Sequence, residues 1–122
     1  MKKKVTIIDD DDDLRGLLSA ALVQFGFEPD CYATADNIIK QNYRQTDLFL
    51  IDIDLSGISG LELCKHLKSQ SATKDIPVII ISANPEIRAL AEAVCAEGSL
   101  PKPFSQFQLK ESISKALNGK PG

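Results

Sequence analysis

Short apolar segments alternate along this chain with segments whose apolar residues have helical spacing. Three of them, VTII (5–8), DLFLIDI (47–53) and IPVIIIS (76–82), are rich in β-branched residues and apolar at successive positions. Both faces of such a strand are covered, as in the central strands of a parallel sheet between two layers of helices. The alternation therefore predicts an α/β fold.

The intervening segments predict five helices. They are expected at about 14–25, 36–44, 59–67, 85–98 and 105–118. In the first, apolar residues recur at the spacing of one helix face, and Gly26 can end the helix. Ser59 and Glu62 form a capping box at the start of the third, and Pro85 suits the first turn of the fourth. Ser105 is the expected cap of the fifth.

Two weaker apolar runs, 27–32 and 99–101, complete the alternation. Pro29 cannot donate to a strand ladder, so the first run is expected at a sheet edge. The count gives a doubly wound (βα)5 fold, a five-stranded parallel sheet with right-handed crossovers. We expect one domain over residues 1–118 and a flexible tail at 119–122.

Composition limits the partners of such a domain. The chain has 122 residues, of which 43% are hydrophobic, with a net charge of −3. It offers no basic face to nucleic acid or to an anionic membrane, and no apolar run is long enough to span a bilayer. A cytoplasmic location is expected. The three cysteines Cys31, Cys64 and Cys95 are widely spaced among apolar or helix-forming neighbours, which predicts reduced, buried thiols.

Polar residues follow four of the expected strands at their carboxyl ends. They are Asp9 and Asp10, Asp52 and Asp54, Ser82, and Lys102. Ligands of open α/β sheets bind at this edge, where the strand order reverses. Four separated segments therefore send polar groups to one edge, and this convergence is the strongest functional signal in the sequence.

Asp9 and Asp10 begin a run of five aspartates. The other three, Asp11 to Asp13, lie at the start of the first helix, where the helix dipole stabilises carboxylates by about 0.3–1 kcal/mol each. Asp11 is also placed to pair with Arg15 at i+4. We interpret these three as a helix start and solvated charge.

Four motifs in order resemble the receiver domain of bacterial response regulators, and together they cover nearly the whole chain. IIDDDDDLRGLL matches the first strand and its acidic pair, and DLFLIDIDLSGISGLELCKHL matches the phosphoacceptor segment. PVIIISA matches the strand that bears a hydroxyl group, and LPKPF matches the lysine segment. The resemblance implies a flavodoxin-like receiver fold with strand order 2-1-3-4-5.

The resemblance also implies roles for the site residues. Asp52 would accept a phosphoryl group from a phosphohistidine of a sensor histidine kinase or a histidine phosphotransfer protein. Asp10 would bind Mg²⁺ directly, Asp9 through water, and Asp54 through its backbone carbonyl, together with Asp52. Lys102 would neutralise one phosphate oxygen, and Ser82 would hydrogen-bond another.

Such a domain is a signalling phosphoprotein, which catalyses only its own phosphorylation and dephosphorylation. It would act through a downstream protein target and would not itself bind nucleic acid.

The chain departs from the family pattern at several positions. Asp54 replaces a common methionine or asparagine, Ser56 a proline and Cys95 a glycine. Ser99 stands where the family has an aromatic switch residue, so we predict a weakened or rerouted switch on the face formed by the fourth helix, fifth strand and fifth helix.

Two alternatives remain open from the residues. LFLIDIDLSG also resembles the first motif of haloacid-dehalogenase-like phosphatases, although the acidic pair then stands on the wrong side of the nucleophile. The chain could also be a receiver-like interaction module that is never phosphorylated. His66 is interpreted as a helix-surface residue. The sequence does not predict the cognate kinase or the output target.

Overall fold

A computed structural model describes residues 2–118 of the chain. Five strands and five helices alternate within this range. The strands are β1 (Lys4–Ile8), β2 (Glu28–Tyr32), β3 (Leu48–Asp52), β4 (Val78–Ser82) and β5 (Gly98–Pro101). The helices are α1 (Asp12–Gln24), α2 (Asp36–Ile39), α3 (Gly60–Ser69), α4 (Ile87–Ala93) and α5 (Gln106–Asn118).

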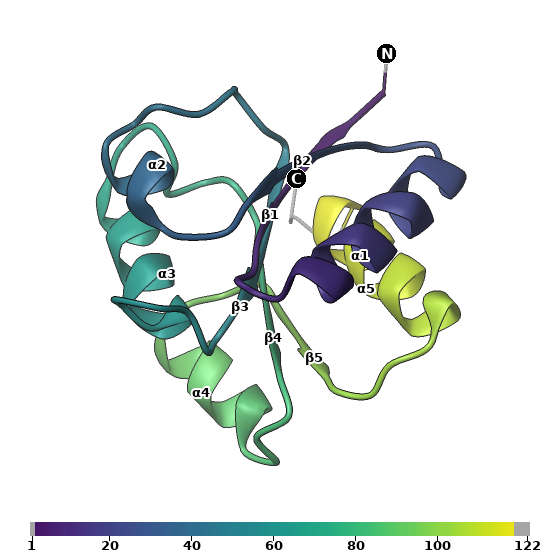
Figure 1. Ribbon diagram of the computed structural model, residues 1–122. Helices are drawn as coiled ribbons and strands as arrows, with labels where there is room; N and C mark the ends of the chain where they lie inside the picture. The colour runs from purple at the N-terminus through teal and green to yellow at the C-terminus, as the bar shows by residue number, and fades with distance from the viewer. Residues whose placement is uncertain (1, 119–122) are drawn as a thin grey trace.

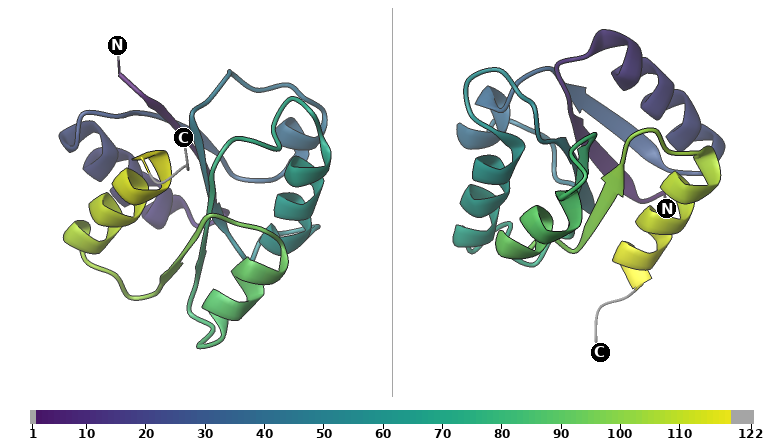
Figure 2. Two further views of the ribbon diagram at one scale, coloured as in Figure 1. Left: turned by 180° about the vertical axis from the view of Figure 1, so that it is seen from behind. Right: turned by 90° about the horizontal axis from the view of Figure 1, so that it is seen from below.

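The strands form one parallel sheet in the order β2-β1-β3-β4-β5. Helices α1 and α5 cover one face, and α2, α3 and α4 cover the other (Figure 1). The sheet between the two helical layers is also seen from behind and from below in Figure 2. The α/β fold and its strand order are confirmed, with β2, which contains Pro29, at an edge.

Both faces of the central strands are buried. Alternate residues such as Val5, Leu50 and Ile79 join the core under α1 and α5, whereas Phe49 and Ile80 join the core under α2, α3 and α4. This two-sided burial explains why these strands are apolar at successive positions. The expected tail at 119–122 lies outside the described residues, so its flexibility stays a prediction.

Two helices are shorter than the sequence predicts. Helix α2 ends at Ile39, not near residue 44, and Gln41 has a positive φ of 58°. The three residues after Ile39, 40–42, are polar, so they add no apolar turn to the helix. Helix α4 ends at Ala93, not near Gly98, because Cys95 has a φ of 62° and turns the chain toward β5.

Ser59 and Ser105 cap the third and fifth helices as the sequence predicts, whereas the return bond from Glu62 to Ser59 stays a prediction. Ser59 Oγ accepts a hydrogen bond from the N–H of Glu62 at 3.1 Å. Ser105 Oγ accepts from the N–H of Gln108 at 3.1 Å, and Gln108 Oε1 accepts from the N–H of Ser105 at 2.8 Å. These bonds satisfy N–H groups that have no partner inside a helix.

A charged network joins three elements at the amino edge of the sheet. Lys68 Nζ, at the end of α3, donates to both carboxylate oxygens of Glu97 at 2.8 and 2.9 Å and to Ile76 O at 2.9 Å. Glu97 Oε1 also accepts from the N–H of Val78, the first residue of β4, at 2.8 Å. The network therefore fixes the end of α3 and the starts of β4 and β5 together.

The cysteine prediction is partly wrong. All three thiols are free, but only Cys64 is buried, whereas Cys31 and Cys95 are exposed. Cys31 lies in the edge strand β2, and its Sγ is 2.8 Å from Ser19 Oγ. Cys31 and Cys95 have apolar neighbours in the sequence. They are nevertheless exposed, because one lies in an edge strand and the other in a turn.

Candidate functional site

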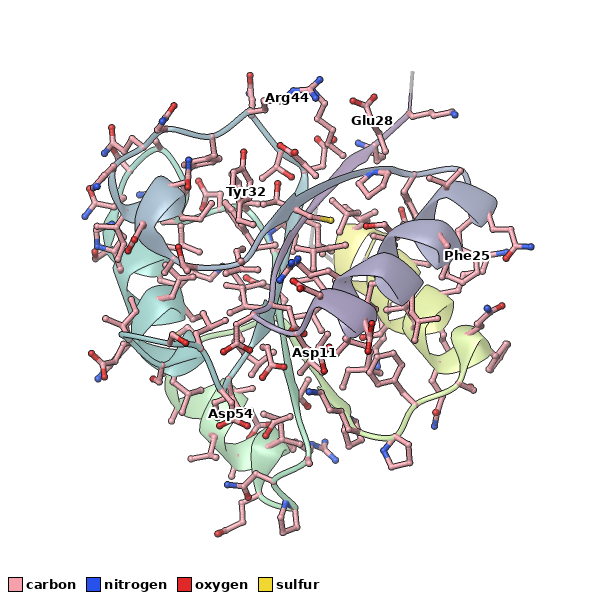
Figure 3. The ribbon with its side chains drawn as sticks, viewed as in Figure 1. Asp11, Phe25, Glu28, Tyr32, Arg44 and Asp54 are labelled. Atoms are coloured by element: carbon pink, nitrogen blue, oxygen red, sulfur yellow. The ribbon has the colours of Figure 1, made fainter. Side chains whose placement is uncertain are left out.

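The polar residues predicted at the strand ends come together at the carboxyl edge of the sheet. Asp9 directly follows β1, Asp52 ends β3, Ser82 ends β4 and Lys102 follows β5. Parallel pairing of β1 with β3 and of β3 with β4 places these ends side by side. Figure 3 shows Asp11 and Asp54 at this end of the molecule, opposite Glu28 and Arg44.

Asp52 lies at the centre of this cluster and is 3% exposed. Its Oδ2 accepts a hydrogen bond from Lys102 Nζ at 2.8 Å, and its Oδ1 accepts from the N–H of Asp54 at 2.8 Å. Each carboxylate oxygen therefore has one donor, which orients the group and compensates its burial.

Lys102 is held at the same place by its backbone. Its N–H donates to Ser82 O at 2.9 Å, and its peptide bond to Pro103 is cis. Burial lowers the pKa of Lys102, but the hydrogen bond and negative charge of Asp52, together with the charges of Asp9 and Asp54, outweigh it. The net pKa of Lys102 is raised, so the ammonium group stays charged.

Asp9 is 1% exposed and faces a different environment. Burial raises the pKa of Asp9 to about 6; the N–H of Asp11, 2.9 Å from Asp9 Oδ1, opposes this shift, and the charge of Asp52 adds to it. Asp9 Oδ2 is buried and has no hydrogen-bond partner among the described residues. A buried carboxylate oxygen without a donor is a position where a cation is favourable.

The remaining predicted ligands are more exposed. Asp10 and Asp54 are both at the surface, and Asp10 Oδ2 accepts a hydrogen bond from Ser56 Oγ at 3.3 Å. Within residues 2–118, no three Asp, Glu, His or Cys side chains form a ready-made set of metal ligands.

This arrangement fits Mg²⁺, which keeps several waters and takes few protein ligands. The buried carboxylates of Asp9 and Asp52 and the exposed carboxylate of Asp10 supply the oxygen donors that Mg²⁺ prefers. Asp9 Oδ2 has no hydrogen-bond partner within the described part of the chain, so it is free to face the ion or its water.

Arg15 is a residue of this region whose role the sequence did not reveal. The expected partner was Asp11, but Arg15 forms an ion pair with Asp12 and donates from Nη1 to the backbone carbonyl of Asp9 at 2.7 Å. Asp11 instead caps α1, and its Oδ1 accepts from the N–H groups of Asp13 and Leu14. The i+3 spacing of Asp12 and Arg15 was the available signal.

Ser82 is 1% exposed, and its hydroxyl also has a partner that the sequence pattern does not indicate. Its Oγ accepts from the N–H of Asn84 at 3.0 Å. This bond leaves the hydroxyl proton of Ser82 available for another acceptor.

Gly60 allows the start of α3 to approach the site closely. A Cβ built at Gly60 would lie 2.2 Å from the carbonyl oxygen of Asp52 and 2.8 Å from its carbonyl carbon. The N–H of Gly60 donates to Ile53 O at 2.8 Å. Only glycine permits this contact, which fixes the backbone that carries Asp52.

Comparison with known proteins identifies the family. The family model for the response regulator receiver domain matches residues 5–114. This chain belongs to the response regulator receiver domain family. Receiver domains are signalling modules of two-component systems and generally use Mg²⁺.

The receiver is similar to part of a longer regulatory protein. It is 33% identical to the phosphate regulon transcriptional regulatory protein PhoB of Escherichia coli K12, over 96% of this chain and 52% of that protein. The chain thus spans about half the length of the curated relatives it matches.

Among solved structures, the receiver superposes on the chemotaxis response regulator CheY4 of Vibrio cholerae with a TM-score of 0.87 and 27% identity, over 96% of this chain and 100% of that one. A putative response regulator from Chloroflexus aurantiacus gives a TM-score of 0.90 at 26% identity, over 96% and 98% of the two chains.

The receiver carries a hollow of about 850 Å³ between α4, β5 and α5. Ser99, predicted from the sequence to stand at the family's aromatic switch position, lines it together with Gly98, Arg88 and Lys115. The predicted weakening of the switch stays a prediction. None of the described helices of this receiver is long and apolar enough to cross a membrane.

Proposed function

We propose that this receiver is the phosphoacceptor of a two-component phosphorelay, in which Asp52 takes a phosphoryl group from a phosphohistidine of a sensor kinase or phosphotransfer protein. The observation that carries the proposal is the environment of Asp52. Its carboxylate is almost fully buried, yet it is oriented by Lys102 and the N–H of Asp54 at the edge where ligands of such sheets bind.

Charge explains why this environment suits phosphoryl transfer. The transferring group spreads negative charge over three oxygens, so the site needs positive charge more than it needs a strong nucleophile. Lys102 provides one cation, because its raised pKa keeps it protonated. When Asp52 becomes an acyl phosphate, Lys102 Nζ loses its carboxylate partner and can follow the charge to a phosphate oxygen.

The aspartates at the ends of β1 and β3 would hold the divalent ion. Asp10 would bind Mg²⁺ directly, Asp9 through water, and Asp52 and the backbone carbonyl of Asp54 would complete the protein ligands. When bound, Mg²⁺ neutralises charge on the phosphoryl oxygens as a Lewis acid. The exposed hydrogen bond from Ser56 Oγ to Asp10 Oδ2, 3.3 Å long, is weak enough to exchange for the ion.

Ser82 would respond to the phosphoryl group. Its hydroxyl proton is free to donate while Oγ still accepts from Asn84 N. Movement of Ser82 toward a phosphate oxygen would pull on Lys102 N, which is bonded to Ser82 O. Partner binding would then change on the surface around α4 and β5.

The decisive experiment is modification by acetyl phosphate with Mg²⁺, followed by intact mass spectrometry. We expect the wild type to gain one phosphoryl group that hydroxylamine removes, and to gain none when EDTA is present. Asp52→Asn should abolish the modification. Asp13→Asn is the matched control, because Asp13 is an exposed aspartate in the same acidic run, and it should retain wild-type labelling.

Two outcomes would overturn the proposal. Absence of any modification in the wild type, with Mg²⁺ and a folded protein, would favour an interaction module that is never phosphorylated. Continuous turnover of an external phosphomonoester would favour the phosphatase alternative, for which the family match gives no support.

A further inference from the structure

Two of the three cysteines lie at one peptide group, the bond between Val94 and Cys95. Cys64, in α3, is fully buried, and its Sγ lies 3.5 Å from the carbonyl oxygen of Val94. The next residue in the chain is Cys95, which is exposed in the turn between α4 and β5. The buried thiol therefore contacts the peptide bond that leads into the exposed cysteine.

The backbone of Cys95 brings the two side chains nearer to each other. Its φ is +62°, a conformation in which the Cβ of an L-residue approaches the carbonyl oxygen of the preceding residue. For Cys95 that oxygen belongs to Val94, the same atom that Cys64 Sγ contacts. Glycine would adopt this conformation without strain, so a cysteine here is a costly choice for a structural turn alone.

An ion pair also joins α3 to the turn that contains Cys95. Lys68 lies one helical turn after Cys64, and Glu97 lies two residues after Cys95; their 2.8 Å ion pair joins the same helix to the same turn. The approach of the two cysteines is therefore supported by a second contact between these segments.

We propose that Cys64 and Cys95 form a redox-sensitive pair that closes to an intramolecular disulfide when the protein meets a hydroperoxide. The assignment is independent of the phosphoacceptor role of Asp52. Cys31, which is exposed in β2 beside Ser19, is the third cysteine of the chain and serves as an internal reference.

The chemistry proceeds in two balanced steps. The Cys95 thiolate attacks the peroxide oxygen, the O–O bond breaks, and Cys95 becomes a sulfenic acid with release of water or an alcohol. Cys64 sulfur then attacks the Cys95 sulfur, the S–O bond breaks, and the departing hydroxide takes the Cys64 thiol proton and leaves as water. The two sulfur atoms together lose two electrons to the peroxide.

The order of the steps follows from exposure. Cys95 is open to solvent, whereas burial raises the pKa of the Cys64 thiol to about 11. The buried thiol is a poor first target and acts as the resolving group, because it contacts the carbonyl group of the residue before Cys95. The disulfide would link α3 to the turn after α4 and restrict movement of that turn.

The test uses the Cys31→Ser chain, treated with hydrogen peroxide without a phosphodonor, then alkylated under denaturing conditions and digested with trypsin without reductant. We expect peptides 45–65 and 89–110, which carry Cys64 and Cys95, to appear as one disulfide-linked species. Both thiols should be lost together from the thiol count, and dithiothreitol should restore both.

Two variants in the same background control the test. Cys95→Ser changes an exposed side chain and should leave Cys64 reduced at peroxide doses that fully cross-link the parent. Cys64→Ala should leave Cys95 to proceed to sulfinic acid, with folding checked by circular dichroism. The wild-type chain should also show Cys31 outside any intramolecular link.

Three results would overturn the proposal. They are oxidation of Cys95 to sulfinic acid while Cys64 stays reduced in the folded parent, a disulfide that joins two chains through Cys95, and linkage of Cys31 in preference to Cys64. None of these results bears on phosphorylation of Asp52, so the two proposals fail separately.

Discussion

Two sets of aspartates near the start of the chain and the sheet edge have the same side chain but different surroundings. Asp9 and Asp52 are buried at strand ends, whereas Asp11, Asp12 and Asp13 are exposed at the start of α1. Asp9 and Asp11 are only two positions apart in the chain. The two buried aspartates repel each other, and Lys102 donates a hydrogen bond to Asp52. The exposed aspartates interact with backbone N–H groups and with Arg15.

This difference shows that position relative to the sheet, and not local sequence, determines what a carboxylate can do. A buried carboxylate pair is costly without a cation, and such a cost persists where it creates a binding site. An exposed carboxylate at a helix start is mildly stabilising and replaceable. Substitutions in the two groups should therefore have effects of different size and sign.

The largest effect should come from a substitution that crowds the backbone of the buried Asp52. Gly60→Ala would place a methyl group against the backbone of Asp52, so the free energy of unfolding should fall by about 3 kcal/mol. Urea denaturation measures the loss. Gly16→Ala is the matched control in α1, where a Cβ would meet nothing within 4 Å, and it should gain about 0.5–1 kcal/mol from helix propensity. Equal effects of the two substitutions would contradict the comparison.

A smaller effect of opposite sign is expected at Asp9. Asp9→Asn keeps an oxygen acceptor for the N–H of Asp11 but removes the buried charge. Without metal, it should raise the free energy of unfolding at pH 7.5 by about 1–3 kcal/mol. Urea denaturation with EDTA measures the gain, and added Mg²⁺ should reduce it, because only the carboxylate attracts the ion.

The pH dependence of this gain has a definite sign. The pKa of Asp9 is raised from 3.8 in the unfolded chain to about 6 in the folded one, so the protonated form stabilises the fold. That stabilisation is complete below 3.8 and is lost as the pH rises through about 6. The advantage of Asp9→Asn should therefore shrink between pH 7.5 and pH 5. An advantage that stays constant over this range would refute the assignment of the buried charge to Asp9.

The smallest effects should lie in the exposed group. Asp11→Ala removes the oxygen that accepts two N–H groups of α1, at a cost of about 1 kcal/mol measured by thermal or urea unfolding. Asp13→Asn removes a charge but no cap, so its cost should be below about 0.5 kcal/mol. A reversed order would mean that the dipole interaction, and not the cap, dominates at this helix start.

Much of the architecture was predictable from the sequence. Runs such as 47–53 and 76–82 are long enough and apolar enough on both faces to identify central strands. The carboxyl edge followed from the ends of those strands, since parallel strands present the same ends together. The pattern of strand ends alone was thus enough to predict Asp52, Ser82 and Lys102 at one edge.

The remainder depends on tertiary contacts that local patterns do not encode. Asp9 and Asp10 are adjacent and identical in type, yet only Asp9 is buried, because the chain turns away from the sheet between them. The early end of α4 is set by a positive φ at Cys95, a conformation that non-glycine residues seldom adopt. The exposure of Cys31 likewise follows from the edge position of β2.

The Lys68–Glu97 network determines where this protein can tolerate substitutions. It secures α3, β4 and β5 at the end of the sheet remote from the acidic cluster. The contacts that hold the layers together and the acidic cluster therefore lie at opposite ends of the sheet. Substitutions can therefore change the charges of the acidic cluster while the Lys68–Glu97 contacts still hold the helices and strands together at the other end.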